Sequence, residues 1–180
     1  MHVVGIIGKL NAGKDTIAAS YQKRGYVRKA FADPIKEIVH QLFKVPREIL
    51  WGSSKARTGD VRKMLQGLGT DYARNIDPDV WVKQMRNQLQ RCRVLKHHGV
   101  VIPDVRFLNE AKMLRKEEHA TLIHVIRPHS DKHETKSATK HQSETESTLI
   151  PHSWVTHTII NDGSLADLEN AVQDILGDHT

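Results

Sequence analysis

The chain has 180 residues, of which 38% are hydrophobic and 27% are charged, and its formal net charge is +6. This composition predicts one globular domain and excludes a disordered chain, and no apolar run approaches the ~20 residues that span a bilayer. A basic chain attracts anions, but the charge here is spread along the sequence, with only three Trp, three Tyr and three Phe available for base stacking. We therefore expect no stable nucleic-acid partner and no membrane association.

The first residues, Met1–Ile7, lack the basic start and the cleavage site of a signal peptide, and Cys92 is the single cysteine. One cysteine cannot form an internal disulfide, the bond that typically stabilises exported domains. We therefore expect a cytoplasmic protein.

The chain opens on a predicted strand, a glycine-containing loop and a predicted helix. His2–Ile7 is apolar and β-branched, a helical pattern runs from Gly13 to about Arg24, and residues 8–14 between them read GxxxxGK. Glycines let successive N–H groups surround phosphate oxygens, the helix N-terminus adds partial positive charge, and Lys14 can reach the β- and γ-phosphates. The pattern predicts a phosphate-binding loop; the alternative is a glycine-rich turn with an accidental lysine.

Asp15 stands where Ser or Thr usually holds magnesium in such loops, and Thr16 follows, placed to donate to an α-phosphate. A carboxylate at this position could coordinate Mg²⁺ directly or through water, or it could act as a general base towards an acceptor. The simplest alternative is a favourable charge in the first helical turn. Because a carboxylate beside a triphosphate needs a cation, we favour the metal role.

The second predicted strand, Tyr26–Phe31, leads to a helix at 33–43 that begins with Asp33 as N-cap and proline after it. Lys36 lies in the same helix, near where an acceptor would bind. A second Asp-Pro pair, Asp77-Pro78, precedes a helical pattern at Val80–Leu95 in the same way.

Residues 44–95 have helical patterns and no convincing strand. Within them Arg62 and Gln66 are four residues apart and share a helical face, which suits the phosphate of a nucleotide. Trp81 fits the core of an amphipathic helix better than a platform for a base. We expect this segment to be a helical insertion that binds the acceptor.

Gly99–Pro103 is the third predicted strand, and Asp104 and Arg106 follow it. Ligands of open α/β sheets lie at the carboxyl ends of the strands, where an aspartate can bind magnesium and an arginine can hold a phosphate. The alternative is a helix N-cap and a surface arginine.

Leu122–Arg127 is the fourth predicted strand, and the polar residues 128–153 after it suggest either a lid or a disordered loop, of which we favour the lid. Arg127 begins this segment, and a lid would bring such positive charge over a transferring phosphoryl group. Its histidines have irregular spacing and no accompanying cysteine, so a solvated loop is favoured over a metal site.

Val155–Asn161 is the fifth predicted strand, followed by a turn at 161–164. Ser164 and Asp167 form a candidate capping box for a last helix that ends near Gly177. Strand and helix alternate, so we predict an α/β protein with a mainly parallel five-stranded sheet in a three-layer P-loop NTPase fold. Its core would comprise residues 1–43, 96–127 and 154–180.

Several segments resemble the bacteriophage deoxynucleoside monophosphate kinases. They read GKLNAGKDT, FADPIKE, MLQGLGTDYAR, IDPDVW, IPDVRFLNE and INDGSLADL, the last being shared with dephospho-coenzyme A kinases. The resemblance implies a nucleoside monophosphate kinase fold, ATP with Mg²⁺ as donor, and a deoxynucleoside monophosphate as acceptor. It also implies that the donor residues are Lys14, Asp15 and Thr16, and that the acceptor residues include Arg62, Arg74, Asp104 and Arg106.

The expected catalytic residues are Lys14, Asp15, Arg106 and Arg127, and the expected metal ligands are Asp15 and Asp104. The expected ATP-binding residues are Gly8, Asn11, Ala12, Gly13, Lys14, Asp15, Thr16, Asn161 and Gly163. The expected acceptor-binding residues are Asp33, Lys36, Arg62, Gln66, Arg74, Trp81, Asp104, Arg106 and Glu144.

These features predict a phosphotransferase that moves the terminal phosphoryl group of ATP to a deoxynucleoside monophosphate, with the positioned acceptor attacking in line. The sequence leaves open whether the protein forms a homodimer. One alternative is a kinase for another phosphorylated metabolite, such as dephospho-coenzyme A. The other is a nucleotide- or nucleic-acid-binding module without kinase activity; the base-reading Asn-Lys-x-Asp of switch GTPases is absent from the sequence.

Overall fold

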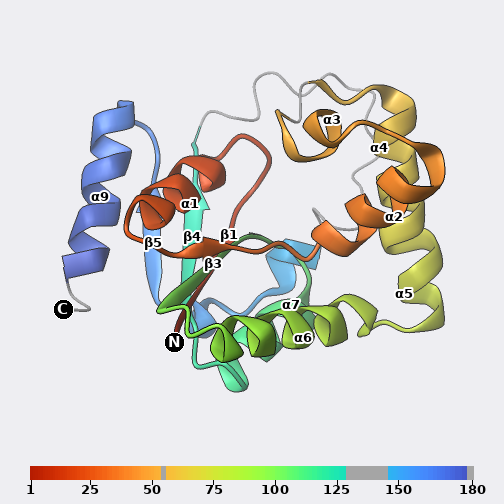
Figure 1. The fold of residues 1–180 in the computed structure, drawn as a ribbon. Coiled ribbons are helices and arrows are strands. Elements are labelled where there is room, and N and C mark those ends of the chain that lie inside the picture. Colours follow the sequence, from red (N-terminus) through yellow and green to blue (C-terminus); the bar gives the residue numbers. More distant parts are fainter. Residues whose placement is uncertain (54–55, 129–145, 178–180) are drawn as a thin grey trace. The chain divides into compact units, whose positions relative to one another are not determined.

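The computed structural model describes residues 1–53, 56–128 and 146–177, and these form two compact units (Figure 1). The first unit comprises residues 1–29 and 88–180 within the described ranges, and the second comprises residues 30–87. Helix α6, Val80–Val94, contributes residues to both units. None of the described helices combines the length and the apolar character needed to cross a membrane.

The first unit contains one five-stranded sheet. Its strands are β1 His2–Ile7, β2 Val27–Arg28, β3 Gly99–Val105, β4 Thr121–Ile126 and β5 His157–Ile160. They lie in the order β2-β3-β1-β4-β5, and every neighbouring pair is parallel. The predicted five-stranded parallel sheet is therefore confirmed.

Strand β2 is much shorter than the predicted Tyr26–Phe31. It lies at the edge of the sheet, and its pairing with β3 covers only Val27 and Arg28, with one further bond from the N–H of Lys29 to the carbonyl of Val101. The ring of Tyr26 instead packs edge-on against Tyr21 and His98. An edge strand pairs with a neighbour on one side only, so fewer hydrogen bonds are available to hold additional residues in the strand.

The register brings the carboxyl ends of the central strands to one edge of the sheet. Val4 lies opposite Val101 and Thr121, and Ile7 lies opposite Val105 and His124. The segments that follow β1, β3 and β4 begin at this edge. They contain the predicted phosphate loop, Arg106 and Arg127. Asp104 was expected to follow the third strand, but β3 extends to Val105, so Asp104 is its penultimate residue.

Helices cover both faces of this sheet. Helices α1 Lys14–Lys23 and α9 Leu165–Gly177 share a buried apolar cluster with alternate residues of β1, β3, β4 and β5. Helix α7, Leu108–Lys116, packs on the opposite face, where a Cβ at Gly5 would lie 2.9 Å from Leu114 Cδ1. The helix–strand–helix layering matches the predicted three-layer arrangement, although no helix at 108–116 was predicted.

The second unit is helical. It contains α2 Asp33–Phe43, α3 Arg47–Trp51, α4 Gly59–Gln66, the π-helical segment η2 Gly67–Tyr72, α5 Ala73–Ile76 and the start of α6. Val39, Leu50 and Val61 form the centre of one buried cluster here. Over residues 44–53 and 56–95 the structure has no strand before β3, as the sequence predicted.

The helix-start predictions have mixed outcomes. Asp33 was expected to be an N-cap, and this is wrong: it is the first residue of α2, and Ala32 occupies the cap position. The Asp33 carboxylate instead accepts a bond from Trp51 Nε1 (3.1 Å) and lies 3.6 Å from Lys36 Nζ. The capping box of α9 is confirmed, with Ser164 N donating to Asp167 Oδ2 (2.7 Å) and Asp167 N donating to Ser164 Oγ (3.3 Å).

Two short 3₁₀ turns, η4 Ser147–Leu149 and η5 His152–Trp154, precede β5. The predicted lid at 128–153 lies largely outside the described residues, as does Glu144. The lid and the helical insertion stay predictions.

Candidate functional site

The loop between β1 and α1 has the backbone conformation that its glycines allow. Gly13 has φ 111° and Asn11 has φ 60°, both in the left-handed region, where glycine is unstrained and asparagine is tolerated. A Cβ at Gly13 would lie 2.7 Å from Asn161 Nδ2 and 3.0 Å from Leu168 Cδ2. The second glycine of the pattern is therefore required both by its φ and by the close approach of Asn161, which follows β5, and of Leu168 in α9.

Side chains from three places hold the carbonyl groups of this loop. Lys14 Nζ donates to the carbonyls of Gly8 (2.6 Å) and Lys9, and Asn161 Nδ2 donates to Ala12 O (2.8 Å). Arg127 Nη1 lies 3.5 Å from Asn11 O. Asn161 and Arg127, two of the predicted site residues, therefore lie beside the loop although they are far from it in the sequence.

Helix α1 begins without a side-chain cap. Its N-cap is Gly13, which has no side chain that could bond to the N–H groups of the first turn. These N–H groups and the helix dipole make the start of α1 a favourable place for a phosphate. Asp15 projects from this turn with its side chain 91% exposed, and its Oδ1 lies 3.5 Å from Arg28 Nη2.

The end of β3 is held by a buried carboxylate. Glu110 is 1% exposed, and its Oε2 accepts bonds from the backbone N–H groups of Arg106 (2.8 Å) and Phe107 (3.0 Å). Asp104 and Arg106 are half-buried at this point. The backbone that carries Arg106 is therefore fixed at the edge of the sheet where the loop also lies.

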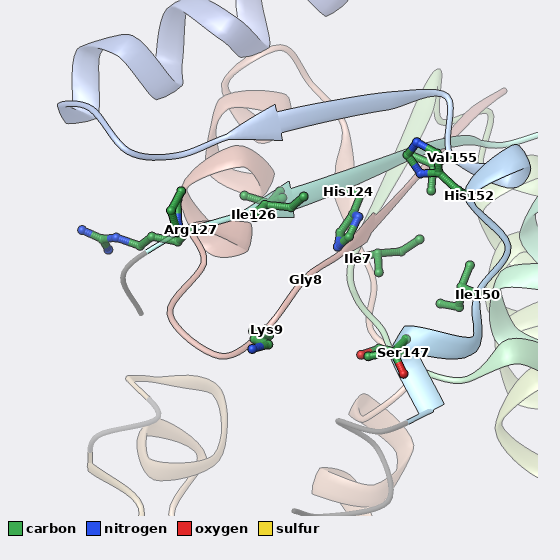
Figure 2. Close-up of a pocket in the computed structure, with 13 residues that line it drawn as sticks. Ile7, Gly8, Lys9, His124, Ile126, Arg127, Ser147, Ile150, His152 and Val155 are labelled. Atoms are coloured by element: carbon green, nitrogen blue, oxygen red, sulfur yellow. The ribbon is translucent and has the colours of Figure 1, made fainter. Parts of the chain in front are cut away.

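A cavity of about 490 Å³ opens beside the first residues of the loop (Figure 2). Gly8 and Lys9 form one side, and Ser147, Ile150 and Val155 form the side that precedes β5. Figure 2 shows the imidazole of His124, within β4, and the side chain of Ile7, at the end of β1, directed into this space. The cavity thus adjoins the loop and belongs wholly to the first unit.

His124 has a depressed pKa because of this setting. Burial lowers its pKa below the ordinary value of 6.5, and His152 lowers it further. We expect an NMR titration of the ring to show a midpoint below 6.5. In His152→Asn the midpoint should rise but stay below 6.5, because burial is the larger cause. A midpoint at or above 6.5 in the unmodified protein would contradict the buried environment.

Two comparisons of sequence identify the family. A family model described as deoxynucleotide monophosphate kinase matches residues 47–172. Over 147 residues the chain is 36% identical to a protein of Acanthamoeba polyphaga mimivirus provisionally named deoxynucleotide monophosphate kinase, covering 71% of this chain and 75% of the viral one. The chain belongs to the deoxynucleotide monophosphate kinase family. The resemblance predicted from the motifs is confirmed.

Two solved structures have a fold similar to that of this chain. TT1252 from Thermus thermophilus is 18% identical, covers 99% of this chain and 98% of its own, and has a TM-score of 0.52. A dephospho-CoA kinase from Campylobacter jejuni is 11% identical, covers 98% of this chain and 96% of its own, and has a TM-score of 0.54. With the parallel five-stranded sheet, these matches confirm the predicted P-loop kinase fold.

The predicted acceptor residues of the second unit have varied surroundings. Lys36 is 6% exposed, beside Asp33 and 5.6 Å from the centre of the Trp51 ring. Trp81 is 5% exposed and donates to Gly69 O (2.7 Å), in keeping with the preference for a core position.

Arg62 and Gln66 are exposed on α4, whereas Arg74 Nη1 donates to Pro78 O (3.3 Å). Gly163 and Thr16 lie in the first unit, in the turn before α9 and in the first turn of α1. The roles of all these residues in this family member stay predictions.

Sequence reasoning missed three residues that lie at the candidate site. Glu110 could have been found, because it lies three residues after Phe107, the spacing of a carboxylate that bonds back to a helix start. His124 could have been found as the polar residue within an apolar strand. Arg28 carried no signal, since its contact with Asp15 joins an edge strand to a helix start.

Proposed function

We propose that this protein transfers the γ-phosphoryl group of ATP to a deoxynucleoside monophosphate, giving ADP and the deoxynucleoside diphosphate. The observation that supports it best is the position of Lys14. Its ammonium group bridges the carbonyls of Gly8 and Lys9 at the uncapped start of α1. A triphosphate placed along the first-turn N–H groups would bring its β- and γ-phosphates to this ammonium group.

In this proposal the chain's residues position and stabilise charge. Lys14 Nζ exchanges the two carbonyls for phosphate oxygens, and Thr16 donates to the α-phosphate. Arg106, with its backbone held by Glu110, binds the acceptor phosphate. An acceptor oxygen then forms a bond to the γ-phosphorus as the bond to the β–γ bridging oxygen breaks, and the electron pair leaves with ADP. The acceptor dianion is already nucleophilic, so no general base is required.

The proposal includes Mg²⁺ carried with ATP. Within the described ranges, no group of three or more His, Cys, Asp or Glu side chains could hold a metal ion by itself. This fits Mg²⁺, which usually takes one or two protein carboxylates together with waters and phosphate oxygens. Asp15 and Asp104 are the residues that would hold it, and when bound it would neutralise charge on the phosphates. We further propose a cytoplasmic enzyme of deoxynucleotide metabolism.

A substrate panel tests the proposal against its nearest rival. The fold shared with a dephospho-CoA kinase makes dephospho-coenzyme A the competing acceptor. We expect coupled assays of ADP release to give kcat/KM for at least one of dGMP, dTMP, dAMP and dCMP about 100-fold above that for dephospho-coenzyme A, a difference of about 2.7 kcal/mol. Turnover of dephospho-coenzyme A alone would transfer the assignment to the rival, and absence of turnover with all five would refute both.

Binding of nucleic acid is tested separately. The module without kinase activity would bind DNA with an affinity that falls steeply as salt is raised. We expect no such binding under conditions in which the kinase turns over.

A further inference from the structure

A charged cluster in the second unit has no part in the phosphoryl transfer described so far. It lies wholly within residues 30–87 and contains Asp33 and Lys36 at the start of α2, together with Arg47 and Trp51 on α3. Lys36 is 6% exposed, so its ammonium group has lost most of its contact with water. A buried charge is costly unless a partner balances it, so the position of the Asp33 carboxylate strongly influences what Lys36 can bind.

The indole of Trp51 determines where the Asp33 carboxylate points. Trp51 Nε1 donates to Asp33 Oδ1 at 3.1 Å, and the same oxygen lies 3.6 Å from Lys36 Nζ. The second distance is longer than the roughly 2.7–2.9 Å of a charge-assisted hydrogen bond. Trp51 therefore holds the carboxylate near the ammonium group without a short bond between the two charged groups.

Arg47 in turn holds the indole in place. Its guanidinium carbon lies 4.2 Å from the centre of the Trp51 ring, which is a cation–π distance. Its two terminal nitrogens donate to Glu37 Oε2 (3.0 Å) and Oε1 (2.7 Å) on α2. Arg47 and Trp51 are four residues apart and share one face of α3, so the ring is fixed against the first turns of α2.

We propose that Trp51 is a positioning residue, which acts through Asp33 to keep the Lys36 ammonium group able to contact the phosphate of the acceptor. The inference rests on the proposed function, in which Lys36 is a predicted acceptor residue. While it is bonded to Trp51, the Asp33 carboxylate balances the buried charge at a distance. Without that bond the carboxylate is free to turn and pair closely with Lys36, and it then competes with the acceptor's phosphate.

Trp51→Phe tests this assignment, because it removes the indole N–H and keeps an aromatic ring beside Arg47. It should raise KM for the best deoxynucleoside monophosphate about 3- to 10-fold, the effect expected when one hydrogen bond is lost. The kcat and the KM for ATP should stay within about twofold, because the substitution alters only how the acceptor is held. An unchanged KM for the acceptor in a folded variant would overturn the assignment.

Trp154→Phe is the matched control for this substitution. Trp154 lies in the first unit, in the turn before β5, with Lys116 Nζ 5.9 Å from the centre of its ring. The same exchange at this place should leave both KM values unchanged. Circular dichroism melts of the two variants show whether each one folds.

A second substitution shows whether Trp51 acts through Asp33. In Asp33→Asn the side chain has no charge with which to pair with Lys36. Adding Trp51→Phe to this variant should therefore raise the acceptor's KM by less than about twofold further, since the two changes remove one shared interaction. A purely structural role of Trp51 would give the same increase with aspartate or asparagine at position 33, and that additive result would overturn the assignment while the kinase function stands.

A binding measurement on the unmodified protein covers the case in which a variant does not fold. The indole N–H signal of Trp51, assigned by triple-resonance NMR, should shift when the best deoxynucleoside monophosphate is added. It should stay in place with the matching deoxynucleoside, which lacks the phosphate. No shift, or an equal shift with the deoxynucleoside, in a protein that turns over normally would overturn the assignment. Absence of turnover with every deoxynucleoside monophosphate would instead refute the proposed function and this inference with it.

Discussion

Lys14→Met should leave the protein folded and lower kcat with ATP and the best deoxynucleoside monophosphate by about 10²- to 10³-fold. Removing one donor that stabilises charge in a transition state typically has an effect of this size. Methionine has a similar length and no charge, so the side chain still fits beside Gly8 but cannot neutralise the β- and γ-phosphates. The lost bonds to two carbonyls of a partly solvated loop should lower the free energy of unfolding by only about 1–2 kcal/mol.

Steady-state kinetics and a thermal melt measure the two quantities. Lys23→Met is the matched control, because Lys23 ends the same helix and its side chain is 73% exposed beside Glu169. That pair lies at the surface, where an ion pair contributes little. If Lys14→Met keeps near-normal turnover, the loop does not hold the donor in the proposed way.

Glu110→Ala should lower the free energy of unfolding by about 2–4 kcal/mol. The substitution leaves the N–H groups of Arg106 and Phe107 without their carboxylate acceptor, and each such group costs about 1–3 kcal/mol when it is buried. Arg106 is half-buried, so water offsets part of the loss there. Urea unfolding at constant pH measures the change.

Glu110→Gln is the control for this second prediction. Its side-chain carbonyl can accept both N–H bonds, so we expect a much smaller loss of stability than in Glu110→Ala. If Arg106 holds the acceptor phosphate, the alanine variant should also raise KM for the acceptor, while the glutamine variant should not. Equal losses in the two variants would show that the charge of Glu110, rather than its bonds to the start of α7, stabilises the protein.

The elements that were predicted well have strong local signals. Strand β1 is a run of apolar residues bounded by glycine, and its predicted range, His2–Ile7, equals the observed one. The capping box of α9 depends on residues three apart, and both of its bonds form. The helix start at Asp33 was predicted one residue late. The carboxylate that was expected to cap the helix accepts a bond from the indole N–H of Trp51, eighteen residues away.

The amino-acid sequence alone determined the family, the phosphate loop with Lys14, and the alternation that gives a parallel α/β sheet. Each of these depends on residues that are close in sequence or on a periodic pattern, because loop conformation and strand or helix preference are local. Only the tertiary structure decided that Asn161, the residue after β5, bonds to the loop, that Glu110 fixes the backbone of Arg106, and that His124 and Ile150 line one cavity. Those contacts join segments whose pairing depends on strand order and register, and no local pattern encodes the register of strands so far apart in the chain.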